Sequence, residues 1–150
     1  MIFVECKPDK ALVSSLGARD VRHHEGKNKL LNKLRKETAA KAMVDQDPRA
    51  AQHPYLRSLQ RNEEQDNIIL CHDSKSRNTV ILLCPDLEGW LLKTLRETGG
   101  SMEAFGMSEN KYKLHKQLTV HPEKIRKVVD RIFDQSEHLK TLKQFLEVKL

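Results

Sequence analysis

Short apolar runs alternate with amphipathic helical segments between residues 2 and 47, and this alternation most constrains the fold. "MIFVE" is a short strand-like run, "DVRHH" is a weaker one, and "AAKAMV" leads into the acidic "DQDP". The segments between these runs, including "KNKLLNKLRKE", carry apolar residues at helical spacing. The order strand, helix, strand, helix, strand with short connections predicts a parallel sheet with crossover helices.

The middle of the chain continues the alternation. "YLRSLQRNEEQ" predicts a short helix, whereas "NIILCHD" and "NTVILLC" are branched apolar runs that predict two strands, with a hairpin as one arrangement. "PDLEGWLLKTLRETGG" begins with a proline and ends on two glycines, which predicts a helix.

The last third of the chain is predicted to be helical. A break is expected near Gly106, and two amphipathic helices follow, one from Pro122 and one after Ser136, which suits an N-cap. We therefore expect an α/β fold in which a mostly parallel sheet is flanked by helices and carries a helical C-terminal extension. One domain would span residues 1–150, with its α/β core in about 1–100 and its helical part in about 101–150.

The number of cysteines and the length of the apolar runs indicate the cellular compartment in which the protein is expected. The three cysteines, Cys6, Cys71 and Cys84, are odd in number and show no CxxC spacing, which favours reduced thiols in a cytoplasmic protein. The longest apolar run is far shorter than a membrane span. The N-terminus lacks a basic segment before a long apolar core, so it does not resemble a secretory signal. We expect a cytoplasmic protein with no membrane partner.

The net charge of +6 is unevenly distributed. Residues 1–50 carry 11 basic and 7 acidic side chains, residues 51–109 carry 6 and 9, and residues 110–150 carry 10 and 5. Basic flanks around an acidic middle suit a polyanion such as nucleic acid that meets a carboxylate-lined site. Lysines and arginines that only solvate helix faces would produce the same pattern.

Four acids follow the first and third predicted strands. Glu5 ends the first strand, Asp9 lies in the first turn of the next helix, and Asp45 and Asp47 end the third strand. The carboxyl ends of parallel strands share one edge, so these carboxylates are expected to converge there and to bind a hard cation, Mg²⁺ or Mn²⁺. Taken singly, Asp-x-Asp is common in turns and caps, and Asp9 suits a helix N-terminus.

These two acidic motifs resemble the Toprim family, which includes topoisomerases, bacterial primases and OLD-type nucleases. "FVECKPDKALVSSLG" matches the strand ending in Glu with Asp four residues later, and "AMVDQDP" matches the later Asp-x-Asp. Cys6 stands where the family usually has glycine. The resemblance covers roughly residues 1–50 and implies a Toprim-like sheet, with Glu5, Asp45 and Asp47 as the main Mg²⁺ ligands and Asp9 serving a second ion.

A further likeness lies in "CPDLEGWLLKTL". Small Toprim-related proteins linked to phage defence, the RloB-like group, carry a similar segment after the last strand. The resemblance implies that Glu88 is an additional catalytic acid near the metal site, as in OLD-type nucleases. The alternative is that Glu88 is a first-turn helix acid beside core residues such as Trp90.

The resemblance implies a metal-dependent nuclease that hydrolyses phosphodiester bonds in DNA or RNA. Basic side chains in the first and last parts of the chain are expected to hold the nucleic-acid backbone. They are Lys7, Lys10, Arg49, Lys111, Lys113, Lys116, Arg126 and Lys127. The alternative is a non-catalytic Toprim-like module that binds nucleic acid or a partner, such as an ATPase of a defence system.

Overall fold

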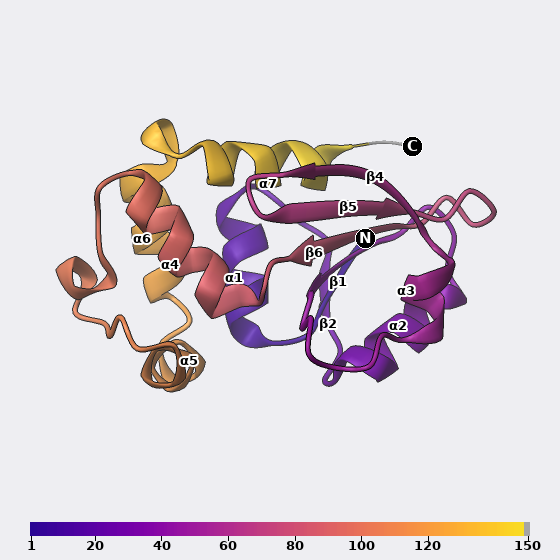
Figure 1. Ribbon diagram of the computed structural model, residues 1–150, viewed down its shortest axis with the longest axis horizontal. Helices are drawn as coiled ribbons and strands as arrows, with labels where there is room; N and C mark the ends of the chain where they lie inside the picture. Colours follow the sequence, from indigo (N-terminus) through magenta and orange to yellow (C-terminus); the bar gives the residue numbers. More distant parts are fainter. Residues whose placement is uncertain (149–150) are drawn as a thin grey trace.

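The protein is built around one six-stranded sheet with helices on both faces, as the computed structural model of residues 1–148 shows (Figure 1). The strands are β1 (Ile2–Val4), β2 (Val21–His23), β3 (Lys41–Asp45), β4 (Gln60–Gln65), β5 (Ile68–His72) and β6 (Thr79–Leu83). The α-helices are α1 (Lys7–Ser15), α2 (Lys27–Arg35), α3 (Pro54–Ser58), α4 (Leu87–Glu97), α5 (Lys111–Val120), α6 (Lys124–Ile132) and α7 (Glu137–Glu147). Two 3-10 helices are η1 (Met102–Phe105) and η2 (Phe133–Gln135).

The strand order is β2-β1-β3-β6-β5-β4, and the first four strands of that order are parallel. The prediction of a mostly parallel sheet flanked by helices is therefore confirmed. Successive side chains of β1 and β3 enter two different cores. Ile2, Val4 and Met43 face a larger core with α1, α4, α6 and α7, whereas Phe3 and Val44 face a smaller core with α2 and α3. Because helices cover both faces, β1 and the centre of β3 are continuously apolar instead of alternating.

The other half of the sheet is antiparallel. β5 pairs with β6 and with β4, so the two predicted strands in "NIILCHD" and "NTVILLC" are confirmed. The helix predicted for residues 55–65 is wrong in its second half. Only Pro54–Ser58 is helical, and Gln60–Gln65 is an edge strand whose six side chains are all exposed. Backbone pairing with β5, interrupted by a bulge between Arg61 and Glu63, holds this strand in the sheet.

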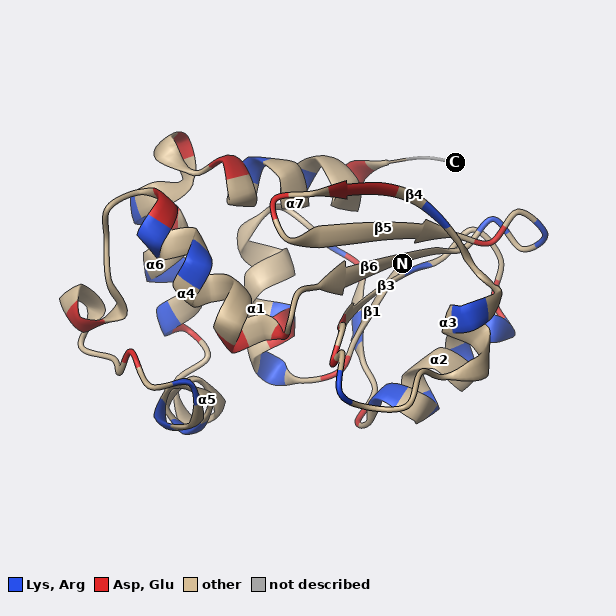
Figure 2. Ribbon diagram, in the orientation of Figure 1, with Lys and Arg blue, Asp and Glu red and all other residues tan. Residues whose placement is uncertain are grey.

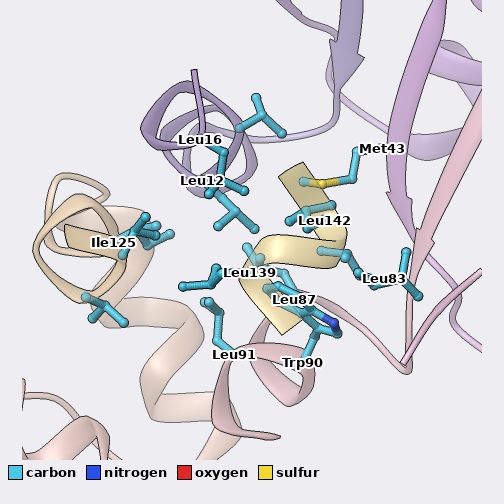
Figure 3. Packing of buried hydrophobic residues seen from close by; sticks show 14 of the residues in the cluster. Leu12, Leu16, Met43, Leu83, Leu87, Trp90, Leu91, Ile125, Leu139 and Leu142 are labelled. Atoms are coloured by element: carbon cyan, nitrogen blue, oxygen red, sulfur yellow. The ribbon is translucent and has the colours of Figure 1, made fainter. Parts of the chain in front are cut away.

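The larger core joins the C-terminal helices to the sheet (Figure 3). Trp90 belongs to this core and is fully buried, and its indole N–H donates a hydrogen bond of 3.1 Å to the carbonyl oxygen of Asp66. The same core contains leucines from α1, α4 and α7 and Ile125 from α6. The predicted helical C-terminal part therefore covers one face of the sheet.

Two of the residues predicted to begin or end helices, Ser136 and Gly106, do so in the structure. Ser136 caps α7 by accepting a hydrogen bond from the backbone N–H of Leu139, and Gly106 ends η1 in the left-handed conformation at φ 72°. Asp86 caps α4 by accepting a hydrogen bond of 2.8 Å from the backbone N–H of Gly89. Within residues 1–148, no helix combines the length and the apolar character needed to cross a membrane.

Candidate functional site

The predicted acids gather at one edge of the sheet, where β1, β3 and β6 end. These three strands are neighbours, and α1 and α4 begin directly beyond β1 and β6. β2 and β3 lie on opposite sides of β1, so the chain changes direction across the sheet between Glu5, which follows β1, and Asp45, which ends β3. Such a switch point is the usual ligand site of an open parallel sheet. Figure 2 shows acidic residues where β6 leads into α4.

A pocket of about 420 Å³ lies at this edge. Glu5, Asp9, Asp45 and Glu88 all line it, although they come from four places: the connection between β1 and α1, the first turn of α1, the end of β3 and the first turn of α4. Asp9 is only 3% exposed and Glu88 only 7%. The structure thus brings four of the five predicted acids to the wall of one cavity.

Asp45 links β3 to the start of α4. Its Oδ1 accepts a hydrogen bond of 2.9 Å from the backbone N–H of Leu87. Burial, together with the negative charges of Asp9 and Asp47, raises the pKa of Asp45 to about 8. Asp45 therefore holds a proton at neutral pH unless a positive charge enters the pocket.

Asp9 is buried in the first turn of α1. Burial raises its pKa to about 7, against a hydrogen bond of 2.9 Å that its Oδ2 accepts from the Cys6 thiol. Burial also raises the pKa of that thiol, which stays protonated and can donate. Cys6 adopts φ −147° and ψ 170°, an extended conformation open to any residue, so cysteine in place of glycine introduces no backbone strain here.

Lys27, the first residue of α2, supplies a cation that the sequence did not reveal. Its Nζ lies 2.6 Å from the carbonyl oxygen of Asp45 and 3.5 Å from Oδ2 of Asp47, and its side chain is 17% exposed. Burial and the charge of Asp47 raise the pKa of Glu5, while the charge and the backbone N–H of Lys27 lower it. Lys27 offsets part of the negative charge of the acids around it.

Asp47 lies beside Lys27 and does not line the pocket. In an extended chain Asp45 and Asp47, two residues apart, would point to the same side, but Asp47 has φ 48° and the chain is not extended there. Its backbone N–H donates to the carbonyl oxygen of Pro85, which draws the chain out of line with β3. Asp47 still acts electrostatically on Glu5 and Asp45.

Glu88 lies in the first turn of α4, as both readings of the sequence allowed, and it has a partner that was not predicted. Its Oε1 is 2.6 Å from Nδ1 of His115, which comes from α5 and also lines the pocket. The side chain of Glu88 is 9% exposed and that of His115 is 63% exposed, so the pair joins the buried wall to the solvent-facing rim. Nothing in the spacing of residues 88 and 115 indicates this contact.

The predicted basic residues are distributed over the surface. Lys111 forms an ion pair with Asp86 at the start of α4. The remaining seven are exposed, on α1 (Lys7, Lys10), after β3 (Arg49), on α5 (Lys113, Lys116) and on α6 (Arg126, Lys127). Lys7 is the one among these seven that lines the pocket.

The acids already have protein partners in the arrangement described. Within residues 1–148, no three histidine, cysteine or acidic side chains are arranged as they stand to hold a metal ion. No protein-family model, curated protein or solved structure matches the chain.

Proposed function

We propose that this protein is a Toprim-like nuclease that uses Mg²⁺ or Mn²⁺ to hydrolyse phosphodiester bonds in DNA or RNA. The observation that carries the proposal is the convergence of Glu5, Asp9, Asp45 and Glu88 on one pocket at the switch point of the sheet. A setting in phage defence, with an ATPase or another defence protein as partner, belongs to the same proposal through the Toprim resemblance.

The chemistry of the donor atoms suits a hard divalent cation, and the side chains would have to move together to bind it. All four pocket acids offer carboxylate oxygens, the ligands that Mg²⁺ and Mn²⁺ prefer. The raised pKa values of Asp9 and Asp45 show that negative charge is costly in the pocket, and a cation would relieve that cost. Asp45 and Asp9 each give one oxygen to a protein donor, which leaves the other for an ion.

The acids would bind two metal ions, each held by a different set of residues. Glu5, Asp45 and Asp47 would hold the first ion, and Asp9 and Glu88 would serve a second. Asp47 reaches this role only if it exchanges its ion pair with Lys27 for the metal. A bound ion would lower the pKa of an attacking water and neutralise charge on the scissile phosphate and the leaving oxygen.

The protein side chains act on the substrate around the pocket. Lys7 on its wall can pair with a phosphate oxygen, and His115 at its rim keeps Glu88 oriented through their 2.6 Å contact. The exposed lysines and arginines of α5 and α6 attract the nucleic-acid backbone, an interaction that weakens as salt is added.

Calorimetric titration with Mg²⁺ and Mn²⁺ tests the metal site. The wild type is expected to bind the ion, and the double variant Asp45→Asn/Asp47→Asn is expected to lose binding. Asparagine at 45 keeps an acceptor for the Leu87 N–H, so the start of α4 is retained. Glu63→Gln on the exposed edge strand is the matched control and should bind as the wild type does. A folded wild type that binds neither ion would refute the metal site.

Cleavage assays on DNA and RNA test the reaction. We expect cleavage that needs Mg²⁺ or Mn²⁺ and stops in EDTA. Asp45→Asn should lower the rate at least about 100-fold, since loss of even an outer partner of a metal ligand costs roughly 10–100-fold. Full activity of this variant would sink the proposed role of Asp45.

One observation favours the rival function, a non-catalytic Toprim-like binding module. Asp9, Asp47 and Glu88 are already engaged by Cys6, Lys27 and His115 without a metal. If these contacts are permanent, the pocket is a structural feature. Salt-sensitive nucleic-acid binding with no metal-dependent turnover would favour this rival.

A further inference from the structure

Helix α5 exposes apolar side chains on the side away from the core. Within residues 1–148, the exposed large hydrophobic residues are Met1 at 37%, Tyr112 at 80% and Val120 at 70%, and the last two lie on α5. Leu114 and Leu118 anchor the opposite side of the helix and are fully buried. Tyr112 is therefore displayed to solvent by a helix that the core holds in place.

Tyr112 belongs to the same stripe of α5 that reaches the acidic pocket. At 100° per residue, Tyr112, His115, Lys116 and Thr119 fall within an arc of about 100° and span about 10 Å along the helix. His115 and Thr119 line the pocket. We call these four residues the α5 ridge. A ligand on Tyr112 at one end of the ridge would be led toward the acids at the other.

The lysines of α5 give the helix itself a positive charge. α5 carries three lysines and no acidic residue, as its blue and tan ribbon in Figure 2 shows. Lys111 is held by Asp86, whereas Lys113 and Lys116 are exposed. A single flat aromatic ring among cations suits a ligand that alternates flat apolar faces with negative charges, which describes bases and phosphates.

The strand state follows from the position of the ring. Bases in a duplex stack on one another and do not present their faces to a side chain at the protein surface, whereas bases of a single strand do. Tyr112 is 80% exposed on a helix, so a base can approach its ring without rearrangement of the core.

We propose that the α5 ridge binds single-stranded nucleic acid, with one base stacked on Tyr112 and the backbone passing Lys116 toward the pocket. This inference rests on the proposed function, because it specifies the strand state of that substrate. It differs from general attraction to basic residues in requiring an aromatic ring at one position.

Binding measured in EDTA separates the ridge from catalysis. Fluorescence anisotropy with short labelled oligonucleotides is expected to show that Tyr112→Ala weakens single-strand binding about 5- to 100-fold, the usual effect of removing a stacking ring. Tyr112→Phe keeps the ring and should bind as the wild type does. Lys116→Ala should lower the salt slope by about 0.7, the loss of one phosphate contact on a single strand.

An abasic strand of the same length is the decisive control. Tyr112→Ala should not change its affinity, because the strand keeps its phosphates and has no base to stack. Equal weakening on the intact and abasic strands, or no weakening on either, would overturn the proposal. So would a polyglutamate peptide that competes as strongly as the oligonucleotide, or a duplex whose binding depends on Tyr112 to the same extent.

The two proposals fail in different measurements. If the wild type never cleaves nucleic acid but Tyr112→Ala weakens single-strand binding in EDTA, the nuclease proposal fails and the ridge stands. If the wild type cleaves and Tyr112→Ala binds intact strands normally, the ridge fails and the nuclease proposal stands. Asp45→Asn should keep single-strand binding while losing cleavage.

Discussion

Replacement of Asp45 by asparagine should stabilise the protein as the pH rises from about 5 to 7. Burial raises the pKa of Asp45 from 3.8 to about 8. In the unfolded chain this carboxyl loses its proton above about pH 4, whereas in the folded protein it keeps the proton up to about pH 8. The unfolded state therefore binds fewer protons in this window, and the unfolding free energy falls as the pH rises.

The magnitude follows from the proton count. One proton changes the unfolding free energy by about 1.4 kcal/mol per pH unit, so two units cost the wild type about 2.7 kcal/mol through Asp45. Asp45→Asn lacks this loss. Its stability relative to the wild type should grow by about 2.7 kcal/mol between about pH 5 and 7, or about 5–10 °C in Tm for a chain of this length.

Urea unfolding in EDTA, followed by the fluorescence of Trp90, measures this difference. Trp90 is the single tryptophan and is fully buried, so its emission reports the core. Asp45→Ala is the matched variant. It removes the acceptor of the Leu87 N–H, so it should show the same pH dependence with a roughly constant further cost of about 1–2 kcal/mol. A stability difference that does not change with pH would refute the reasoning, because it would mean that Asp45 is ionised in the folded protein.

Three further variants test contacts around and away from the pocket. Lys27→Met removes the ion pair with Asp47 and should lower the unfolding free energy by about 1–3 kcal/mol. The loss should be larger at pH 8 than at pH 5, because the acids around Lys27 ionise as the pH rises. Urea unfolding at both pH values measures this, and equal losses would contradict it. His115→Ala leaves the buried carboxylate of Glu88 without its partner and should lower the unfolding free energy by about 1–3 kcal/mol. Thermal unfolding measures this, and a variant as stable as the wild type would contradict it. Asn78→Ala deletes a fully buried amide that makes four hydrogen bonds and should cost about 2–4 kcal/mol in chemical denaturation; a loss below about 1 kcal/mol would show that the network is dispensable.

The location of the acids was accessible from the sequence because it depends on a local pattern and one topological rule. Glu5 and Asp45 each stand at the end of an apolar run, and parallel strands place their carboxyl ends at the same edge. Glu88 follows a third apolar run by the same logic. Their roles in metal binding and cleavage stay predictions.

The side chains that contact the acids could not be predicted from the sequence. Lys27 is one of several lysines in α2, and only the packing of that helix beside β3 turns its side chain toward Asp45. His115 meets Glu88 because α5 packs on α4, a contact between residues 27 apart. The pKa shifts also depend on burial, which no spacing in the sequence expresses.

The edge strand β4 shows the limit of periodicity. Gln60–Gln65 carries only polar residues, so neither the alternation of a half-buried strand nor an apolar helix face identifies it. It becomes a strand because the exposed backbone edge of β5 offers hydrogen-bond partners. The next two strands, β5 and β6, consist mainly of buried apolar residues and were identified directly.

The sequence by itself determined the order of helices and strands through its N-terminal and C-terminal parts, the positions of Gly106 and Ser136 at helix ends, and the acids that follow the strands. These features depend on residues near one another in the chain, where propensity and capping act. The tertiary structure alone decided the rest: the antiparallel edge, the cation Lys27 among the acids, the burial that raises their pKa values, and the ridge of α5 beside the pocket. Each of these depends on which surfaces meet when distant segments pack, because burial and charge interactions are set by distance in space and not by distance along the chain.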